Sequence, residues 1–155
     1  TVDMKKHALT LAAAAALAFG ISRIGLLGDF APTPAAQTQT VQTGQADDAL
    51  ATAFAEHQSG IHVTGEGVVI KVLPDDEEGS RHQRFILKLA SGQKVLVAHN
   101  IDLAGRLDSL RAGDTVGFSG QYEWNPKGGV IHWTHRDPRG HHRAGWLKLA
   151  GQTYQ

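Results

Sequence analysis

The chain has 155 residues, with 15 Lys and Arg against 15 Asp and Glu, nine histidines and no cysteine. This balance excludes an overall electrostatic attraction to nucleic acid or acidic lipid, so any charged surface must be local. The lack of cysteine excludes disulfides, thiolate nucleophiles and cysteine-ligated zinc, which leaves His, Asp and Glu as possible metal ligands.

The first 28 residues have the order of an export signal. Two lysines follow Met4 and precede an apolar run from Ala8 to Ala18, which ends in a small-x-small pattern. That order is typical of a cleavable signal peptide. An uncleaved membrane anchor over 8–28 is the alternative, although Arg23 lies inside it. We therefore expect an exported protein, either periplasmic or anchored in the inner membrane and facing the periplasm.

Residues 29–46 predict a disordered linker. From 30 to 44 the sequence FAPTPAAQTQTVQTG has no charge, two prolines and many Thr and Gln, so it cannot bury enough surface to offset its chain entropy. Residues 47–60 then predict a short helix, because Leu50 and Ala53 lie at helical spacing behind Asp47, where a helix N-terminus favours acid.

Residues 61–155 predict a mainly β domain with five strands. Residues 61–73 are rich in β-branched side chains and contain Gly65 and Gly67, which favours a long bent strand with a bulge. Alternating apolar positions bounded by Gly-containing turns predict the other four strands. These are expected at 81–90, 94–101, 111–124 and 130–135.

A helix is expected between the third and fourth strands, where Leu103, Leu107 and Leu110 lie at helical spacing. A small antiparallel sheet leaves exposed edges unless it closes, and a bent first strand allows closure into a five-stranded Greek-key barrel. We therefore expect a small closed OB-like barrel with one helix between strands 3 and 4, preceded by the short helix. An SH3-like barrel or an open sandwich is the alternative, and it would lack the helix between strands 3 and 4.

Three segments carry a resemblance to a known family. They are LPDDEEGSRHQRFILKLASGQKVLVAHNIDLA, GDTVGFSGQYEWNPKGGVIHWTHRDP and GWLKLAGQTYQ. Over nearly all of Gly65 to Gln155 the chain resembles the bacterial family catalogued as domain of unknown function 3465. The resemblance implies small exported proteins with one compact domain, and it names no catalytic residue.

The candidate site is a polar surface of histidine and arginine. The stretch HWTHRDPRGHH, residues 132–142, contains four histidines, two arginines and one aspartate. In a closed barrel, strands two, three and five would add side chains from elsewhere in the chain, and the barrel face across strands two and three is a common binding groove. The predicted ligand-binding residues are His82, Arg84, His99, His132, His135 and Arg136.

Convergence of these residues depends on how the fifth strand ends. Residues three apart on a flat strand face opposite sides, so His132 and His135 meet only if the strand ends or bulges near Thr134. Asp137-Pro138 supports such an ending. The first interpretation is a binding module for an anionic ligand, either an oligonucleotide or an acidic glycan, with a membrane contact only through an uncleaved N-terminus.

The alternative interpretation is a metal-dependent hydrolase, of phosphodiesterase or nuclease type, that uses the same histidines. Neutral imidazoles suit zinc or copper when cysteine is absent. The predicted metal ligands are His82, His99, His132, His135 and Asp137. No metal-binding motif of fixed spacing accompanies them.

A structural interpretation competes with both. In it, one or two histidines are hydrogen-bonded residues of the core or rim, and His99 binds a loop. His141 and His142 belong to a solvated connection, because Trp146 and Leu147 begin an apolar tail that packs back on the barrel. A purely structural envelope component is the function class that this interpretation favours.

Overall fold

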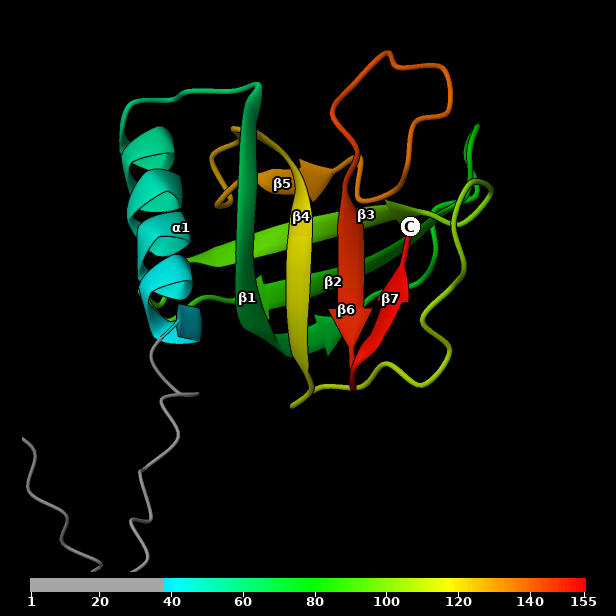
Figure 1. Ribbon diagram of the computed structural model, residues 1–155, viewed down its shortest axis with the longest axis horizontal. Coiled ribbons are helices and arrows are strands. Elements are labelled where there is room, and N and C mark those ends of the chain that lie inside the picture. Colours follow the sequence, from blue (N-terminus) through cyan, green and yellow to red (C-terminus); the bar gives the residue numbers. More distant parts are fainter. Residues whose placement is uncertain (1–37) are drawn as a thin grey trace, which may run out of the picture. The chain divides into compact units, whose positions relative to one another are not determined.

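A computed structural model describes residues 38–155 of the chain (Figure 1). The expected signal peptide or anchor over 1–28, and residues 29–37 of the expected linker, lie outside the described residues. Across the described part of the chain, no helix combines the length and the apolar character needed to cross a membrane.

One helix and seven strands make up the regular structure of residues 38–155. The helix, α1, spans Thr38–Ala55. The strands are β1 (Ile61–Val72), β2 (His82–Lys88), β3 (Lys94–Asn100), β4 (Thr115–Glu123), β5 (Val130–His132), β6 (Trp146–Leu149) and β7 (Gln152–Tyr154).

Five of these strands form a closed barrel, as the sequence predicted. Their order is β1-β2-β3-β5-β4, and β4 pairs with β1 to complete the ring. Neighbouring strands are antiparallel except β3 and β5, which run parallel. Because β1 bends, Val68 lies opposite both Lys88 of β2 and Thr115 of β4. The bend lets one strand join the two sides of the barrel.

The bulge in β1 is not where the glycines predicted it. It lies between Val69 and Lys71, beyond Gly65 and Gly67. Gly65 serves close packing instead, since a Cβ atom there would lie 2.8 Å from the Cβ of Ala46 in α1. The missing side chain at Gly65 therefore allows α1 to approach the barrel.

Alternating side chains fill the barrel interior. The alternating apolar positions that predicted β2 and β4 point inward, and α1 contributes to the same cluster. Each Val, Leu, Ile or Phe side chain contributes roughly 1.5–3 kcal/mol when fully buried. The fully buried members include Leu50, Ala53, Phe85, Leu87, Val95, Val97, Val116, Phe118, Tyr122, Ile131 and Leu147.

Helix α1 is longer than predicted. It begins at Thr38, inside the segment 29–46 expected as a linker, and Asp47 lies within it rather than at its N-terminus. The Asp47 carboxylate accepts a 2.7 Å hydrogen bond from the backbone N–H of Ser91 in the β2–β3 turn. The indole N–H of Trp124 donates to the carbonyl of Phe54 at 3.1 Å. The end of β4 and the β2–β3 turn thus both bind α1.

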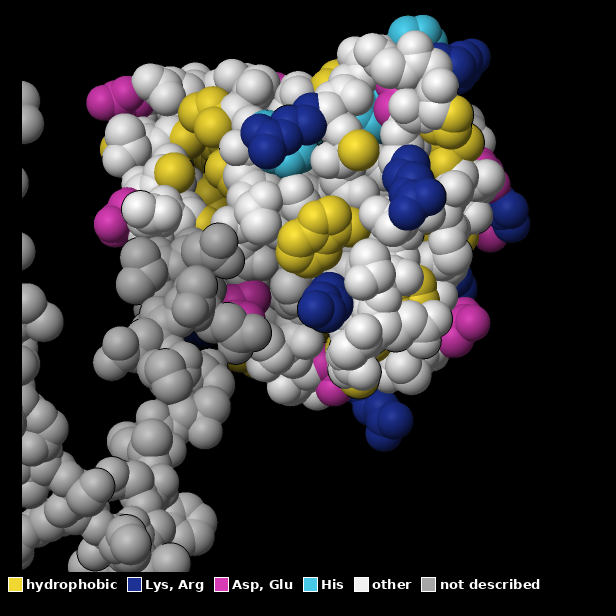
Figure 2. Space-filling model, viewed as in Figure 1, with side chains coloured by type: hydrophobic (Ala, Val, Ile, Leu, Met, Phe, Trp, Pro, Cys, Tyr) yellow, Lys and Arg dark blue, Asp and Glu magenta, His cyan; other side chains and the backbone are white. Residues whose placement is uncertain are grey.

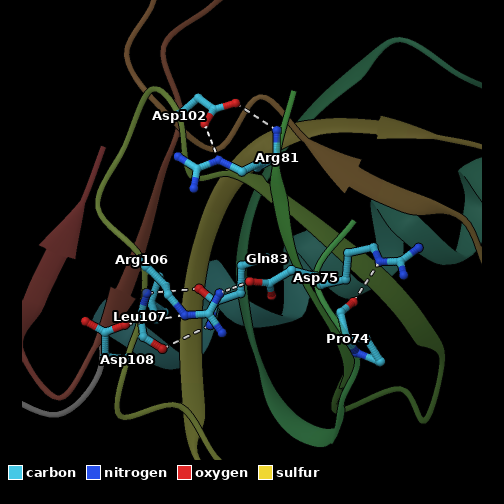
Figure 3. Close-up of polar contacts among 9 residues, drawn as sticks. Pro74, Asp75, Arg81, Gln83, Asp102, Arg106, Leu107 and Asp108 are labelled. Carbon is cyan, nitrogen blue, oxygen red and sulfur yellow. Dashed lines mark hydrogen bonds and ion pairs between the residues drawn. The ribbon is translucent and has the colours of Figure 1, made fainter. Parts of the chain in front are cut away.

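The helix expected between β3 and β4 is absent, and residues 101–114 form an irregular loop. The side-chain amide of Gln83, which is 1% exposed, donates to the Leu107 carbonyl at 3.0 Å and accepts from the Leu107 N–H at 2.9 Å. The backbone of Leu107 is therefore hydrogen-bonded to a side chain of β2, where a helix would have used backbone partners (Figure 3). Of the leucines that suggested a helix, Leu107 is buried and Leu103 is 60% exposed.

Ion pairs hold the same loop against the connection between β1 and β2. Asp102 accepts from both the backbone N–H and the Nε of Arg81, at 2.8 and 2.7 Å, and Arg106 pairs with Asp75 (Figure 3). Both partners of the loop therefore lie in the connection 73–81.

The C-terminal tail returns to the barrel as a hairpin. β6 pairs with β4, and β7 pairs with β6, so these two strands extend the sheet beyond the closed ring. Leu147 and Leu149 are buried, which confirms that the tail packs on the barrel.

A histidine and arginine hollow beside strand β5

The outer faces of β2, β3 and β5 line two adjoining hollows. In the barrel register, His82 lies opposite Asn100 and Arg84 lies opposite Ala98, so all four share the outer face. The larger hollow, of about 440 Å³, is called here the His/Arg hollow. Its lining includes Ser80, His82, Ala98, Asn100, Leu103, His132, Trp133, His135, Arg136, Asp137, Pro138, Arg139, His141 and His142.

The smaller hollow, of about 280 Å³, is called here the mixed-charge hollow. It is lined by Asp76, His82, Arg84, Ala98, Glu123, Val130 and His132. The two hollows share His82, Ala98 and His132. Five of the six predicted ligand-binding residues therefore line one hollow or the other.

The end of β5 brings His132 and His135 to the same hollow. The sequence predicted that they would meet only if the strand ended or bulged near Thr134. The strand stops at His132, and Trp133 has a positive φ of 53°. This left-handed turn is unfavourable for a bulky residue and reverses the alternation of side chains. Thr134 then points inward, with no exposure, while His135 lines the same hollow as His132.

His99 does not belong to the hollow, so its predicted place in the site is wrong. It follows Val97 on the inner face of β3 and is completely buried. Its Nε2 donates to the Gly105 carbonyl at 3.1 Å, and its Nδ1 lies 2.8 Å from the Thr134 hydroxyl. Burial lowers the pKa of His99 to about 4. This neutral imidazole joins the loop 101–114 to the loop 133–145.

The Asp137 carboxylate organises the backbone of its own loop. Its carboxylate accepts hydrogen bonds from the backbone N–H groups of Arg139, His141 and His142. Although burial works against ionisation, these bonds hold the pKa of Asp137 at about 2. A carboxylate with three backbone donors is a loop-organising group. The predicted role of Asp137 as a metal ligand is therefore not supported.

Imidazole rings pack around Trp133. The His142 ring stacks on the indole with centroids 4.5 Å apart and an interplanar angle of 14°, and the His132 ring lies 4.7 Å away. His135 meets His142 edge-on at 5.0 Å. The His142 side chain is only 8% exposed. Sequence reasoning placed His142 in a solvated connection, and its packing corrects that expectation.

Two carboxylates of the mixed-charge hollow each lie near a basic side chain. Arg84 lies 3.7 Å from Asp76, and His132 Nε2 lies 3.6 Å from Glu123 Oε1. The latter contact is too long for a hydrogen bond and becomes an ion pair only when the ring is protonated. Burial lowers the pKa of His132, and Glu123 only partly opposes this.

The arginines of the His/Arg hollow are unpaired. Within residues 38–155, no ion pair joins Arg136 or Arg139 to a carboxylate. Asp137 is the one carboxylate in the lining, and its charge is directed at backbone amides. Over the loop between β5 and β6, His and Lys or Arg side chains gather near the top of the space-filling view (Figure 2). The hollow is therefore locally positive although the whole chain is neutral.

The predicted metal set does not assemble. Among the residues that the structure describes, no group of three or more His, Asp or Glu side chains is arranged to hold a metal ion. His99 is hydrogen-bonded in the core, and Asp137 is hydrogen-bonded to the backbone of its own loop. Of the predicted metal ligands, this leaves His82, His132 and His135 with side chains available at the hollow.

Sequence reasoning missed several lining residues. Ala98, Asn100 and Glu123 reach the two hollows through strand register. Their alternation with buried neighbours is visible in the sequence and could have placed them. Arg139 has no such signal, because a loop and not a strand carries it.

The fold and the hollow define a small closed β-barrel domain with a polar histidine and arginine surface. The chain belongs to the family described as "Protein of unknown function (DUF3465)", whose model matches residues 35–155. The resemblance noted over Gly65 to Gln155 is thus confirmed, and the match also includes α1. No curated protein matches the chain.

Proposed function

We propose that this protein is an exported OB-type barrel that binds an anionic ligand in the His/Arg hollow. The observation that carries the proposal is that the arginines of this hollow lack carboxylate partners within the described part of the chain, whereas its carboxylate is already bonded. Arg136 and Arg139 have no carboxylate partner among residues 38–155, while Asp137 is satisfied by backbone amides. Guanidinium groups suit carboxylate, sulfate and phosphate because they donate in a planar fork.

The size and the shape of the hollow support the same function. A volume of about 440 Å³ lies within the usual range for small-ligand sites. The rigid outer face of the barrel supplies His82 and His132, and a loop organised by Asp137 supplies the arginines. Proposed export rests on the order of lysines and apolar residues near Met4.

The test is binding of the full chain to a sulfated polysaccharide, measured by calorimetry at two salt concentrations. We expect Arg136→Glu/Arg139→Glu to weaken binding by more than roughly tenfold. The matched control is Lys71→Glu/Lys148→Glu, which makes the same change of charge at exposed positions outside both hollows. Equal losses in the two variants would contradict a local site.

A further inference from the structure

The two hollows are suited to one elongated ligand. Both are lined by Ala98 of β3, which lies opposite Arg84 of β2. On the other side of β3, the preceding residue Val97 pairs with Ile131 of β5. Ala98 presents only a methyl group where the two hollows adjoin. A larger side chain there would extend into that junction.

The two hollows differ in their charged side chains. The His/Arg hollow offers two unpaired arginines, whereas the mixed-charge hollow contains the carboxylates of Asp76 and Glu123 beside Arg84 and His132. A polynucleotide carries one negative charge per nucleotide and would place phosphates near these carboxylates. Like charges in partly buried positions repel. A chain with sparser charge fits the two hollows better.

Surface for base stacking is also limited. Trp133 is the only tryptophan, tyrosine or phenylalanine in the described lining of either hollow, and His142 already stacks on it. Proteins that bind single-stranded nucleic acid depend on open aromatic faces. Glu123, Asn100 and His82 instead offer the mixture of donors and acceptors that hydroxyl groups require.

We propose that the ligand is an acidic oligosaccharide. Its acidic group lies in the His/Arg hollow, and neighbouring sugar hydroxyls occupy the mixed-charge hollow. This inference rests on the proposed function and specifies the ligand class of the same site.

The experiment compares three chains of equal length on the full protein by calorimetry, at one pH and ionic strength. They are a hexasaccharide with one uronate at its end and five neutral sugars, called here the singly acidic hexasaccharide, a fully neutral hexasaccharide and a single-stranded hexanucleotide. We expect the singly acidic hexasaccharide to bind at least roughly tenfold more tightly than either of the others. A hexanucleotide affinity equal to or above that of the singly acidic hexasaccharide would overturn the inference.

A second arm tests the place where the two hollows adjoin. Ala98→Leu should weaken binding of the singly acidic hexasaccharide roughly tenfold and change binding of the uronate monosaccharide by less than about twofold. Ala112→Leu, at an exposed turn outside both hollows, is the matched control and should change neither. Should Ala98→Leu not fold, Glu123→Gln serves instead, and it should lower the preference for the singly acidic hexasaccharide over the hexanucleotide.

The outcomes separate the two claims. Loss of binding in Arg136→Glu/Arg139→Glu without an effect of Ala98→Leu would overturn the two-hollow ligand and keep anion binding. An unchanged ligand preference in Glu123→Gln would likewise overturn the two-hollow ligand and keep anion binding. Absence of an effect in all of these variants would overturn the proposed function itself.

Discussion

Two long loops leave the barrel, at 101–114 and at 133–145, and one poorly exposed polar side chain organises each. The amide of Gln83 binds the backbone of Leu107 in the first, and Asp137 binds three amides of its own loop in the second. One arginine of each loop shows a contrast, since Arg106 pairs with Asp75 while Arg136 has no carboxylate partner among the described residues. Arg106 thus helps to attach the first loop, whereas Arg136 of the second loop is available to bind the ligand that we propose.

The largest effect should come from breaking the attachment of the first loop. Gln83→Leu leaves the buried N–H and carbonyl of Leu107 without partners. We expect the free energy of unfolding to fall by about 4 kcal/mol, since each buried unsatisfied group costs ~1–3 kcal/mol. Urea denaturation measures this loss. The same substitution at the exposed Gln152 should have little effect, and equal losses would contradict the role of the Gln83 amide.

The histidine that joins the two loops should make stability depend on pH. The pKa of His99 is lowered by burial from 6.5 to about 4, so the unfolded chain takes up the proton first. Its contribution is therefore complete above about pH 6.5 and is lost as the pH falls towards 4, by about 3 kcal/mol at most. Urea denaturation at a series of pH values should show a flatter dependence in His99→Gln.

The matched control for this pH dependence is His141→Gln, because His141 is exposed. It should keep the slope of the unmodified protein. A slope that is the same in His99→Gln and in the unmodified protein would show that His99 titrates alike in the folded and unfolded states.

The smallest effect should follow from releasing the second loop. Asp137→Ala removes the shared acceptor of three amides, so the loop should lose its shape and the affinity for sulfated polysaccharide should fall roughly tenfold. Asp108→Ala in the first loop, where the side chain is 86% exposed, is the control and should leave affinity unchanged. Tighter binding in Asp137→Ala would mean that this carboxylate only repels the ligand.

The barrel was predictable because its signals are local. Alternation in β2 and β4 places Phe85 and Phe118 inside, and the apolar tail predicts that Leu147 is buried. The register of these strands then follows from their two-residue period. Arg84 was placed on the outer surface for the same reason.

The loops were not predictable, because tertiary hydrogen bonds decide them. The spacing of Leu103 and Leu107 favours a helix, but Gln83, more than twenty residues earlier in the chain, satisfies the backbone of Leu107 instead. His99 is buried through contacts with Gly105 and Thr134. No local pattern indicates these particular partners, although the structural interpretation of the sequence had His99 bind a loop.

The central claim is that the second loop binds anions and the first does not. Titration of the full chain with the singly acidic hexasaccharide, followed by NMR of backbone amides and imidazoles, tests it most directly. We expect shifts at residues 135–142 and in the rings of His82 and His132, with residues 103–110 unchanged. Shifts confined to 103–110, or no shifts at 135–142, would contradict the account.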